Sequence, residues 1–287
     1  MTDPLEGCRK KVERAGEHLQ AFDKAVQAWG DLHPYGIDQQ LDPDTSEHVV
    51  RVRKLRHAPL IDWAVVLSDA IHSLRSTLDH LVCVMVRQPP AGDCVGTGFP
   101  IISNAADWDR RRKGRLAPAS GLAKLRGTDS WTQSTIKGLQ PFNDRQEAGG
   151  GNALRILNAL ANIDKHRALH LAEFFLYSPE LRFSPSHAGE VTWVHPGGPL
   201  EDGAEVLRYR LAWGFDQSKV KTETKLGADI VFDQGSPADG MKIAGLLGWL
   251  RDYVEWIIDL FGYRYFGGEP PSGFERTTLR VARSASS

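Results

Sequence analysis

Cysteine is scarce in this chain, which has 3 among 287 residues. Cys8, Cys83 and Cys94 are an odd number and lack the close spacing of a metal-binding motif. A disulfide framework and a structural zinc site therefore lose support. The pattern predicts three reduced thiols and a cytoplasmic protein, with Cys83 as a small core residue.

Long apolar runs are also missing. The N-terminus has no apolar signal region, and the most apolar C-terminal stretch, residues 244–262, is interrupted by Arg251, Asp252 and Glu255. We therefore expect neither secretion nor a membrane-spanning segment. The sequence also lacks the glycine-rich loops that bind nucleotides, the Gly-x-Ser-x-Gly nucleophile elbow and His-Glu-x-x-His. These absences argue against P-loop, Rossmann and α/β-hydrolase chemistry, and we expect no cofactor.

Charge of one sign does not dominate the composition. Lys and Arg total 35 against 36 Asp and Glu, so the formal net charge is −1. A polyanion would therefore need a local basic patch. Residues 110–115 form such a run, and within it Arg111 and Arg112 are candidate phosphate ligands. The alternative is that this run is a solvated surface with no ligand.

Apolar residues recur at helical spacing in several segments of the chain. This periodicity predicts helices over residues 5–29, 60–87, 152–165 and 238–262. Residues 47–54 are a candidate short strand, and residues 91–151 are broken by Gly and Pro into short helices and loops.

Strand-type alternation begins at about residue 170 and continues to residue 233. Turn signals separate its apolar runs, so we expect an antiparallel meander of about four to six strands. The fold class is α+β, with a helical bundle over 1–168 and a β-sheet insertion over 169–235. A C-terminal helix over 236–266 returns to the bundle, and a flexible tail follows over 267–287.

The predicted helix over 60–87 carries an unusual polar face. Leucines, Ile71 and Met85 occupy the opposite side of the helix. The polar face carries two carboxylates, two imidazoles, a guanidinium and a hydroxyl. These candidate site residues are Asp69, His72, Arg75, Ser76, Asp79 and His80.

The segment Arg75-Ser-Thr-Leu-Asp-His80 resembles the Arg-x4-His motif of the HEPN superfamily of helical nucleotide-binding and ribonuclease domains. The resemblance implies metal-independent cleavage or binding of RNA by a homodimer, as in many toxin and defence components. His80 would then transfer protons and Arg75 would bind the phosphate. A helix, however, separates residues five apart by about 140°, so Arg75 would have to curl back toward His80.

A second ionisable cluster closes the predicted helix over 152–165. It contains Asp164, His166 and Arg167, and cations at a helix C-terminus have a purely electrostatic explanation. The alternative is that these three side chains complete a polar pocket with the residues of the longer helix, as substrate-binding groups.

Two further functions remain open beside the HEPN-like one. Asp69, His72, Asp79 and His80 are residue types that a metal-dependent hydrolase would use, although no repeated ligand motif is present. The other function is a noncatalytic interaction or scaffold protein, in which the polar cluster organises the fold. In that case a protein partner would bind the β-sheet.

Overall fold

The computed structural model contains helices and small antiparallel sheets, which confirms the predicted α+β class. The residues that the structure describes are 3–87, 93–143, 152–166, 169–175, 180–184, 188–193, 198–199, 201–211, 221–225, 228–233, 236–267 and 269–273. Most of the predicted flexible tail, from residue 274 onward, lies outside these ranges.

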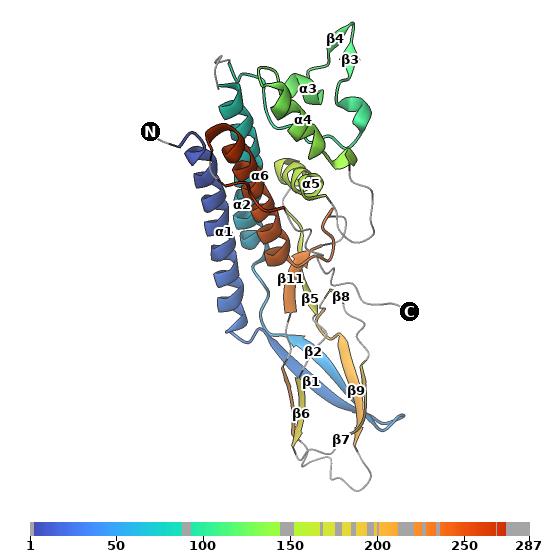
Figure 1. The fold of residues 1–287 in the computed structure, drawn as a ribbon. Helices are drawn as coiled ribbons and strands as arrows, with labels where there is room; N and C mark the ends of the chain where they lie inside the picture. Colours follow the sequence, from blue (N-terminus) through green and yellow to red (C-terminus); the bar gives the residue numbers. More distant parts are fainter. Residues whose placement is uncertain are drawn as a thin grey trace.

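Long helices lie side by side at one end of the molecule (Figure 1). They are α1 (Glu6–Gly30), α2 (Leu60–Val86), α5 (Ala153–His166) and α6 (Ile243–Phe266). The bounds of α1, α2 and α5 agree closely with the predicted helices. Among the described helices, none combines the length and the apolar character needed to cross a bilayer.

The last helix differs from its prediction at both ends. We expected residues 238–262, whereas α6 spans Ile243–Phe266. It starts later because the preceding turn bonds to Phe232, whose N–H donates to the Met241 carbonyl at 3.3 Å. It is followed by Gly267, whose φ of +84° is a conformation that glycine adopts without steric penalty.

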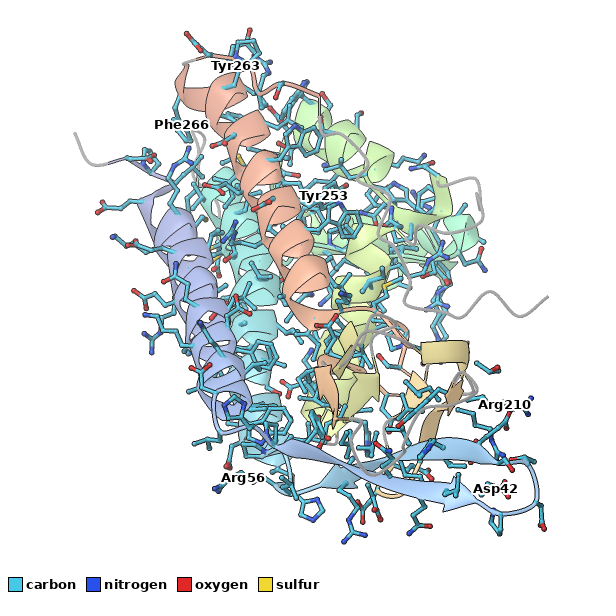
Figure 2. The ribbon with its side chains drawn as sticks, turned by 90° about the horizontal axis from the view of Figure 1, so that it is seen from below. Asp42, Arg56, Arg210, Tyr253, Tyr263 and Phe266 are labelled. Atoms are coloured by element: carbon cyan, nitrogen blue, oxygen red, sulfur yellow. A yellow bond between two sulfur atoms is a disulfide. The ribbon has the colours of Figure 1, made fainter. Side chains whose placement is uncertain are left out.

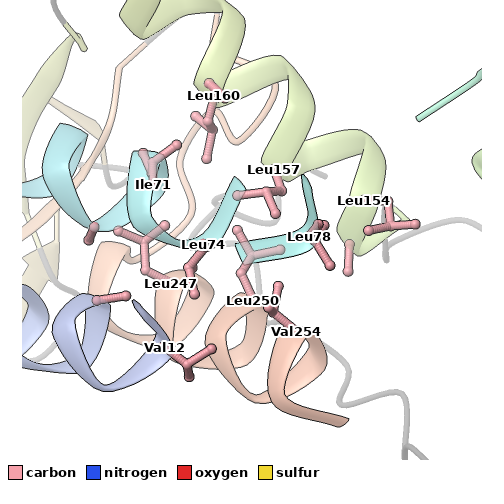
Figure 3. Close-up of a cluster of buried hydrophobic side chains, with 14 of the residues drawn as sticks. Val12, Ile71, Leu74, Leu78, Leu154, Leu157, Leu160, Leu247, Leu250 and Val254 are labelled. Atoms are coloured by element: carbon pink, nitrogen blue, oxygen red, sulfur yellow. The ribbon is translucent and has the colours of Figure 1, made fainter. Parts of the chain in front are cut away.

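A continuous apolar core joins these helices (Figure 3). Leu74 and Leu78 of α2 are fully buried between Leu157 of α5 and Leu250 of α6. Burying a leucine side chain contributes about 1.5–3 kcal/mol. Packing of this kind along its length makes α2 the central helix of the core.

The strands lie mainly at the other end of the molecule (Figure 1). They are β1 (Tyr35–Asp42), β2 (Glu47–Lys54), β5 (Leu171–Phe175), β6 (Glu180–Ser184), β7 (Ala188–Trp193), β8 (Gly198–Pro199), β9 (Glu205–Leu211), β10 (Lys221–Lys225) and β11 (Ala228–Phe232). Within the described residues they form sheets in the orders β1-β2-β9-β7, β11-β5-β8 and β10-β6.

This arrangement corrects two expectations. The strands after residue 169 do not form one meander, because they are divided among three antiparallel sheets. In addition, β1 and β2 precede α2, within the stretch that we assigned to the helices, and β2 pairs with β9. Strand β2 was predicted over residues 47–54, whereas β1 was not predicted. The four-stranded sheet is therefore shared between the predicted helical part and the predicted insertion.

The four-stranded sheet has two different faces near β2 and β9. On one face, Val50, Leu207 and Tyr209 are buried, and the imidazole of His48 stacks on the Tyr209 ring with 4.8 Å between centroids. On the other face, the Arg208 guanidinium binds Glu205 at 2.6 Å and Asp42 at 3.1 Å. The Arg208 guanidinium is thus paired within β9 and, across β2, with the end of β1.

The described residues between α2 and α5, 93–143, form short elements. They are η1 (Ala105–Asp107), the hairpin of β3 (Arg111–Arg112) and β4 (Arg115–Leu116), α3 (Gly121–Lys124), α4 (Ser130–Gly138) and η2 (Pro141–Asn143). The predicted short helices are present, but the basic run forms a β-hairpin.

The prediction of three free thiols is wrong for two of the cysteines. Cys83 near the end of α2 and Cys94 in the following loop form a disulfide, and their Cα atoms are 5.1 Å apart. Cys8 is free and buried in α1, and burial raises the pKa of its thiol to about 11. The disulfide ties the loop that contains Phe99 to the end of α2.

A buried carboxylate connects the sheets with the start of α2. Glu173 of β5 accepts hydrogen bonds from the Tyr35 hydroxyl at 2.8 Å and from the Ala58 N–H at 3.3 Å. The ammonium group of Lys54 lies 3.1 Å from the same carboxylate. Burial, followed by the contact with Glu173, raises the pKa of Tyr35 above its usual range. One charged group therefore holds β1, β2 and β5 together.

We predict that Glu173→Gln lowers the free energy of unfolding by about 1–3 kcal/mol, since it leaves the poorly exposed Lys54 ammonium without its counter-ion. Urea denaturation followed by circular dichroism measures the effect. The exposed Glu201→Gln is the matched control, expected to change stability by less than about 0.5 kcal/mol. Equal effects of the two substitutions would contradict the assigned role of Glu173.

Candidate functional site

The polar face of α2 lies opposite its buried face, as the sequence predicts. Leu67, Ile71, Leu74, Leu78 and Leu81 are fully buried. Asp69 and His72 are exposed to solvent, and the remaining polar residues are half-buried at the two edges of this exposed stripe. Each edge has a different neighbour, and these neighbours determine what the side chains can do.

Arg75 and Asp79 face the loop that follows α2. Arg75 donates from Nη1 to Oδ1 of Asp79 at 2.8 Å and from Nη2 to the Phe99 carbonyl at 2.9 Å. The Phe99 N–H donates to the same Asp79 oxygen at 2.8 Å. A Cβ atom at Gly98 would lie 2.9 Å from that oxygen, so only glycine allows the loop to approach this closely. The guanidinium and the carboxylate together hold residues 98–99 against α2.

Ser76 and His80 face α1 instead. The Lys11 ammonium donates to the Ser76 hydroxyl at 3.1 Å, and this hydroxyl donates to the Ser73 carbonyl. The His80 ring packs on Gly7, where a Cβ atom would lie only 2.5 Å from Cε1 of the imidazole. Gly7 therefore permits α1 and α2 to come together at this point.

The environment of His80 disfavours its charged form. Its Nδ1 atom is buried and has no hydrogen-bond partner within the described residues. Desolvation by burial, followed by the positive charges of Lys11 and Arg87, lowers the pKa of His80 below its ordinary value. The neutral form of the imidazole is therefore favoured.

The structure does not bring Arg75 and His80 into one contact. Arg75 binds the loop beyond α2, whereas His80 packs on α1. This divergence follows from the separation of about 140° between residues five apart in a helix. A shared cavity that could admit a phosphodiester is not formed by these two side chains.

The second predicted cluster is described only in part. Asp164 is half-buried on α5, whereas Arg167 and the side chain of His166 lie outside the described residues. Helix α5 packs through its leucines on the apolar side of α2 (Figure 3). The polar stripe of α2 faces away from that contact, so a common pocket with Asp164 gains no support.

Arg111 and Arg112 lie apart from α2. Both are exposed on the β3–β4 hairpin, which projects from the end of the molecule beyond α3 and α4 (Figure 1). Among the described residues, the structure therefore separates those proposed from sequence into three places: the α2 stripe, Asp164 near the end of α5, and the hairpin.

Metal ligands do not cluster in the described part of the chain, where no group of three or more His, Cys, Asp or Glu side chains is arranged to hold an ion. The metal-dependent alternative therefore gains no support from the α2 stripe. Comparison of the chain with protein-family models, curated proteins and solved structures found no match.

Sequence reasoning missed the residues that face the polar stripe. Gly7, Lys11, Gly98 and Phe99 contribute backbone or side-chain contacts across long sequence separations. No local pattern marks them. The Arg75–Asp79 pair, in contrast, has the i, i+4 spacing at which a cation and an anion meet on a helix, so the sequence did contain a signal for it.

We predict that stability falls as the pH is lowered from about pH 7.5 to about pH 5.5. The pKa values of His80 and His48 are lowered in the folded state, so the unfolded chain binds protons first as the pH falls through about 6.5. Each histidine contributes a slope of at most about 1.4 kcal/mol per pH unit. Urea unfolding at several pH values measures this slope.

The double variant His48→Gln/His80→Gln should show a flatter profile over the same range. The solvent-exposed His72→Gln is the control and should keep the wild-type slope. A double variant that retains the full pH dependence would show that other groups cause it.

Proposed function

We propose that this chain is a noncatalytic interaction protein, in which the polar residues of α2 hold its neighbours in place. The observation that carries this proposal is that Arg75 and His80 contact different elements. Arg75 binds the loop at Phe99, and His80 packs on Gly7 of α1. Residues with such internal roles stabilise contacts between segments. The placement of a protein partner on the β-sheet stays a prediction.

The contacts of Arg75 explain why a catalytic function is the weaker proposal. A guanidinium that stabilises a phosphate presents its paired N–H groups to the anion. The side chain of Arg75 is only 18% exposed, and both of its terminal nitrogens donate to partners within the chain. Binding a phosphate would therefore break the contact that holds the loop.

An endoribonuclease of the HEPN type is the second candidate. The lowered pKa of His80 favours it, because a neutral imidazole can accept a proton from a ribose hydroxyl. In this proposal a second copy of the chain would supply part of the active site.

We predict that Gly7→Ala destabilises the protein by about 1–3 kcal/mol, because the new methyl group meets the His80 ring. In the His80→Ala background the same substitution should be tolerated. The double-mutant cycle should give a coupling of about 1 kcal/mol or more. Chemical denaturation of the four proteins measures these differences.

Gly248→Ala in α6 is the matched control, since a Cβ there meets no atom within 4 Å. It should stabilise the helix by up to about 1 kcal/mol and show no coupling to His80→Ala. Absence of coupling between positions 7 and 80 would remove the structural role assigned to His80.

We also predict that the purified protein does not cleave single-stranded RNA, either in excess EDTA or with added Mg²⁺ or Mn²⁺. Gel electrophoresis of a labelled RNA measures cleavage. Cleavage in EDTA that is lost in His80→Ala, with an unchanged melting temperature, would replace our proposal with the ribonuclease one. Cleavage that EDTA abolishes would instead support the metal-dependent alternative.

A further inference from the structure

The β3–β4 hairpin has a defined and unusual geometry. Arg111 pairs with Leu116 and Arg112 pairs with Arg115, so Lys113 and Gly114 form a two-residue turn. Both turn residues have positive φ, +52° for Lys113 and +77° for Gly114. Asn, Asp or Gly is strongly preferred at the first position of such a turn, so a lysine there is sterically unfavourable.

The hairpin concentrates positive charge on a chain that is otherwise balanced. Five of the six residues from 110 to 115 are Arg or Lys, and all five are exposed. Arg110 pairs with Asp107 at 3.0 Å, and Arg111 donates to the Gly114 carbonyl. Within the part of the chain that the structure describes, Arg112, Lys113 and Arg115 have no ion pair or hydrogen-bonded side-chain partner.

The pairing of Arg112 with Arg115 opposes folding of the hairpin. Like charges directly opposite each other on neighbouring strands destabilise a sheet. The formal net charge of −1 shows that this repulsion is local and is not forced by a basic composition. An anion bound between the Arg112 and Arg115 side chains would relieve this repulsion.

The base of the hairpin is fixed, so its tip is held outward. The Ala117 N–H donates to the Arg110 carbonyl at 2.8 Å, and the Leu122 N–H donates to the Trp108 carbonyl at 3.0 Å. The Trp108 ring is buried and packs so closely on Gly121 that a Cβ there would lie 2.4 Å from it. The cations are thus presented on a hairpin that projects beyond α3 and α4 (Figure 1).

We infer that the β3–β4 hairpin binds the phosphodiester backbone of a nucleic acid through Arg112, Lys113 and Arg115. Guanidinium groups bind phosphate oxygens through paired N–H donors. The hairpin, residues 110–116, contains no aromatic and no amide side chain to stack on or read a base, and Trp108 is buried. Contacts to phosphate carry no base information, so we expect binding that depends little on base sequence. The inference rests on the proposed interaction function and names its partner class.

The test compares two variants that lose the same charge. Arg112→Gln/Lys113→Gln/Arg115→Gln removes the cations of the hairpin. The control, Lys24→Gln/Arg53→Gln/Arg56→Gln, removes exposed cations that lie on α1, on β2 and just after β2, outside the β3–β4 hairpin. Figure 2 labels Arg56 beside the β1–β2 hairpin. Fluorescence anisotropy of a labelled single-stranded RNA measures binding between about 50 and about 200 mM salt.

The hairpin variant should bind at least tenfold more weakly than the wild type, and the control should bind like the wild type. The slope of log affinity against log salt should fall by about 2, since each lost phosphate contact reduces it by about 0.7. The melting temperature of the hairpin variant should be unchanged or higher, because the repulsion between Arg112 and Arg115 is removed.

Further arms of the experiment separate the sources of phosphate. Single-stranded DNA of the same sequence should bind as RNA does if the backbone alone is recognised, and exclusive binding of RNA would identify RNA as the nucleic acid. Equal losses in the control variant, binding only to anionic lipid vesicles, or no binding at all would overturn the inference. None of these outcomes affects the roles of Arg75 and His80, which the cleavage assay and the double-mutant cycle test.

Discussion

The burial of α2 is the constraint on which the rest of the structure depends. Helices α1, α5 and α6 and the loop after α2 all pack against it, and most of its circumference is apolar. Its polar residues are therefore confined to a narrow stripe whose edges adjoin α1 on one side and the loop at Phe99 on the other. Ionisable groups at such edges are stabilised by pairing with the adjoining element, and this is how Arg75 and Asp79 are used.

Much of the helical part could be predicted from the sequence, because the periodicity of apolar residues reflects which side of a helix is buried. The same pattern contains no information about what lies opposite a polar residue. Arg75 meets the Phe99 carbonyl 24 positions away, and Ser76 meets Lys11 65 positions away. The Cys83–Cys94 disulfide was missed for a related reason: the sequence gives an odd count of cysteines, whereas the fold determines which two approach each other.

The strands, like the helices, could be predicted locally but not in their long-range contacts. Alternation of apolar and polar residues indicated strands in the region that contains β9, and residues 47–54 were a candidate strand. Such patterns do not determine strand partners, which depend on register and on the buried face. Strand β1 escaped prediction because Tyr35–Asp42 contains only scattered apolar residues, and it pairs with the whole of β2. The Glu173 carboxylate, reached by Tyr35, Lys54 and Ala58, shows that this hairpin and β5 form one structural unit despite their separation in sequence.

Whether an arginine has an acidic partner in the structure distinguishes structural from binding roles better than its place in a basic run of the sequence does. Arg208 is held by Glu205 and Asp42, which raise the pKa of its guanidinium, and Arg75 is held by Asp79. These pairs stabilise contacts between elements. Arg112 and Arg115 instead lie opposite each other on an exposed hairpin without an acidic partner in the described part of the chain, so they are the cations that we propose for binding an external anion. In this protein, the side chains that fold it and the side chains available to bind are different arginines.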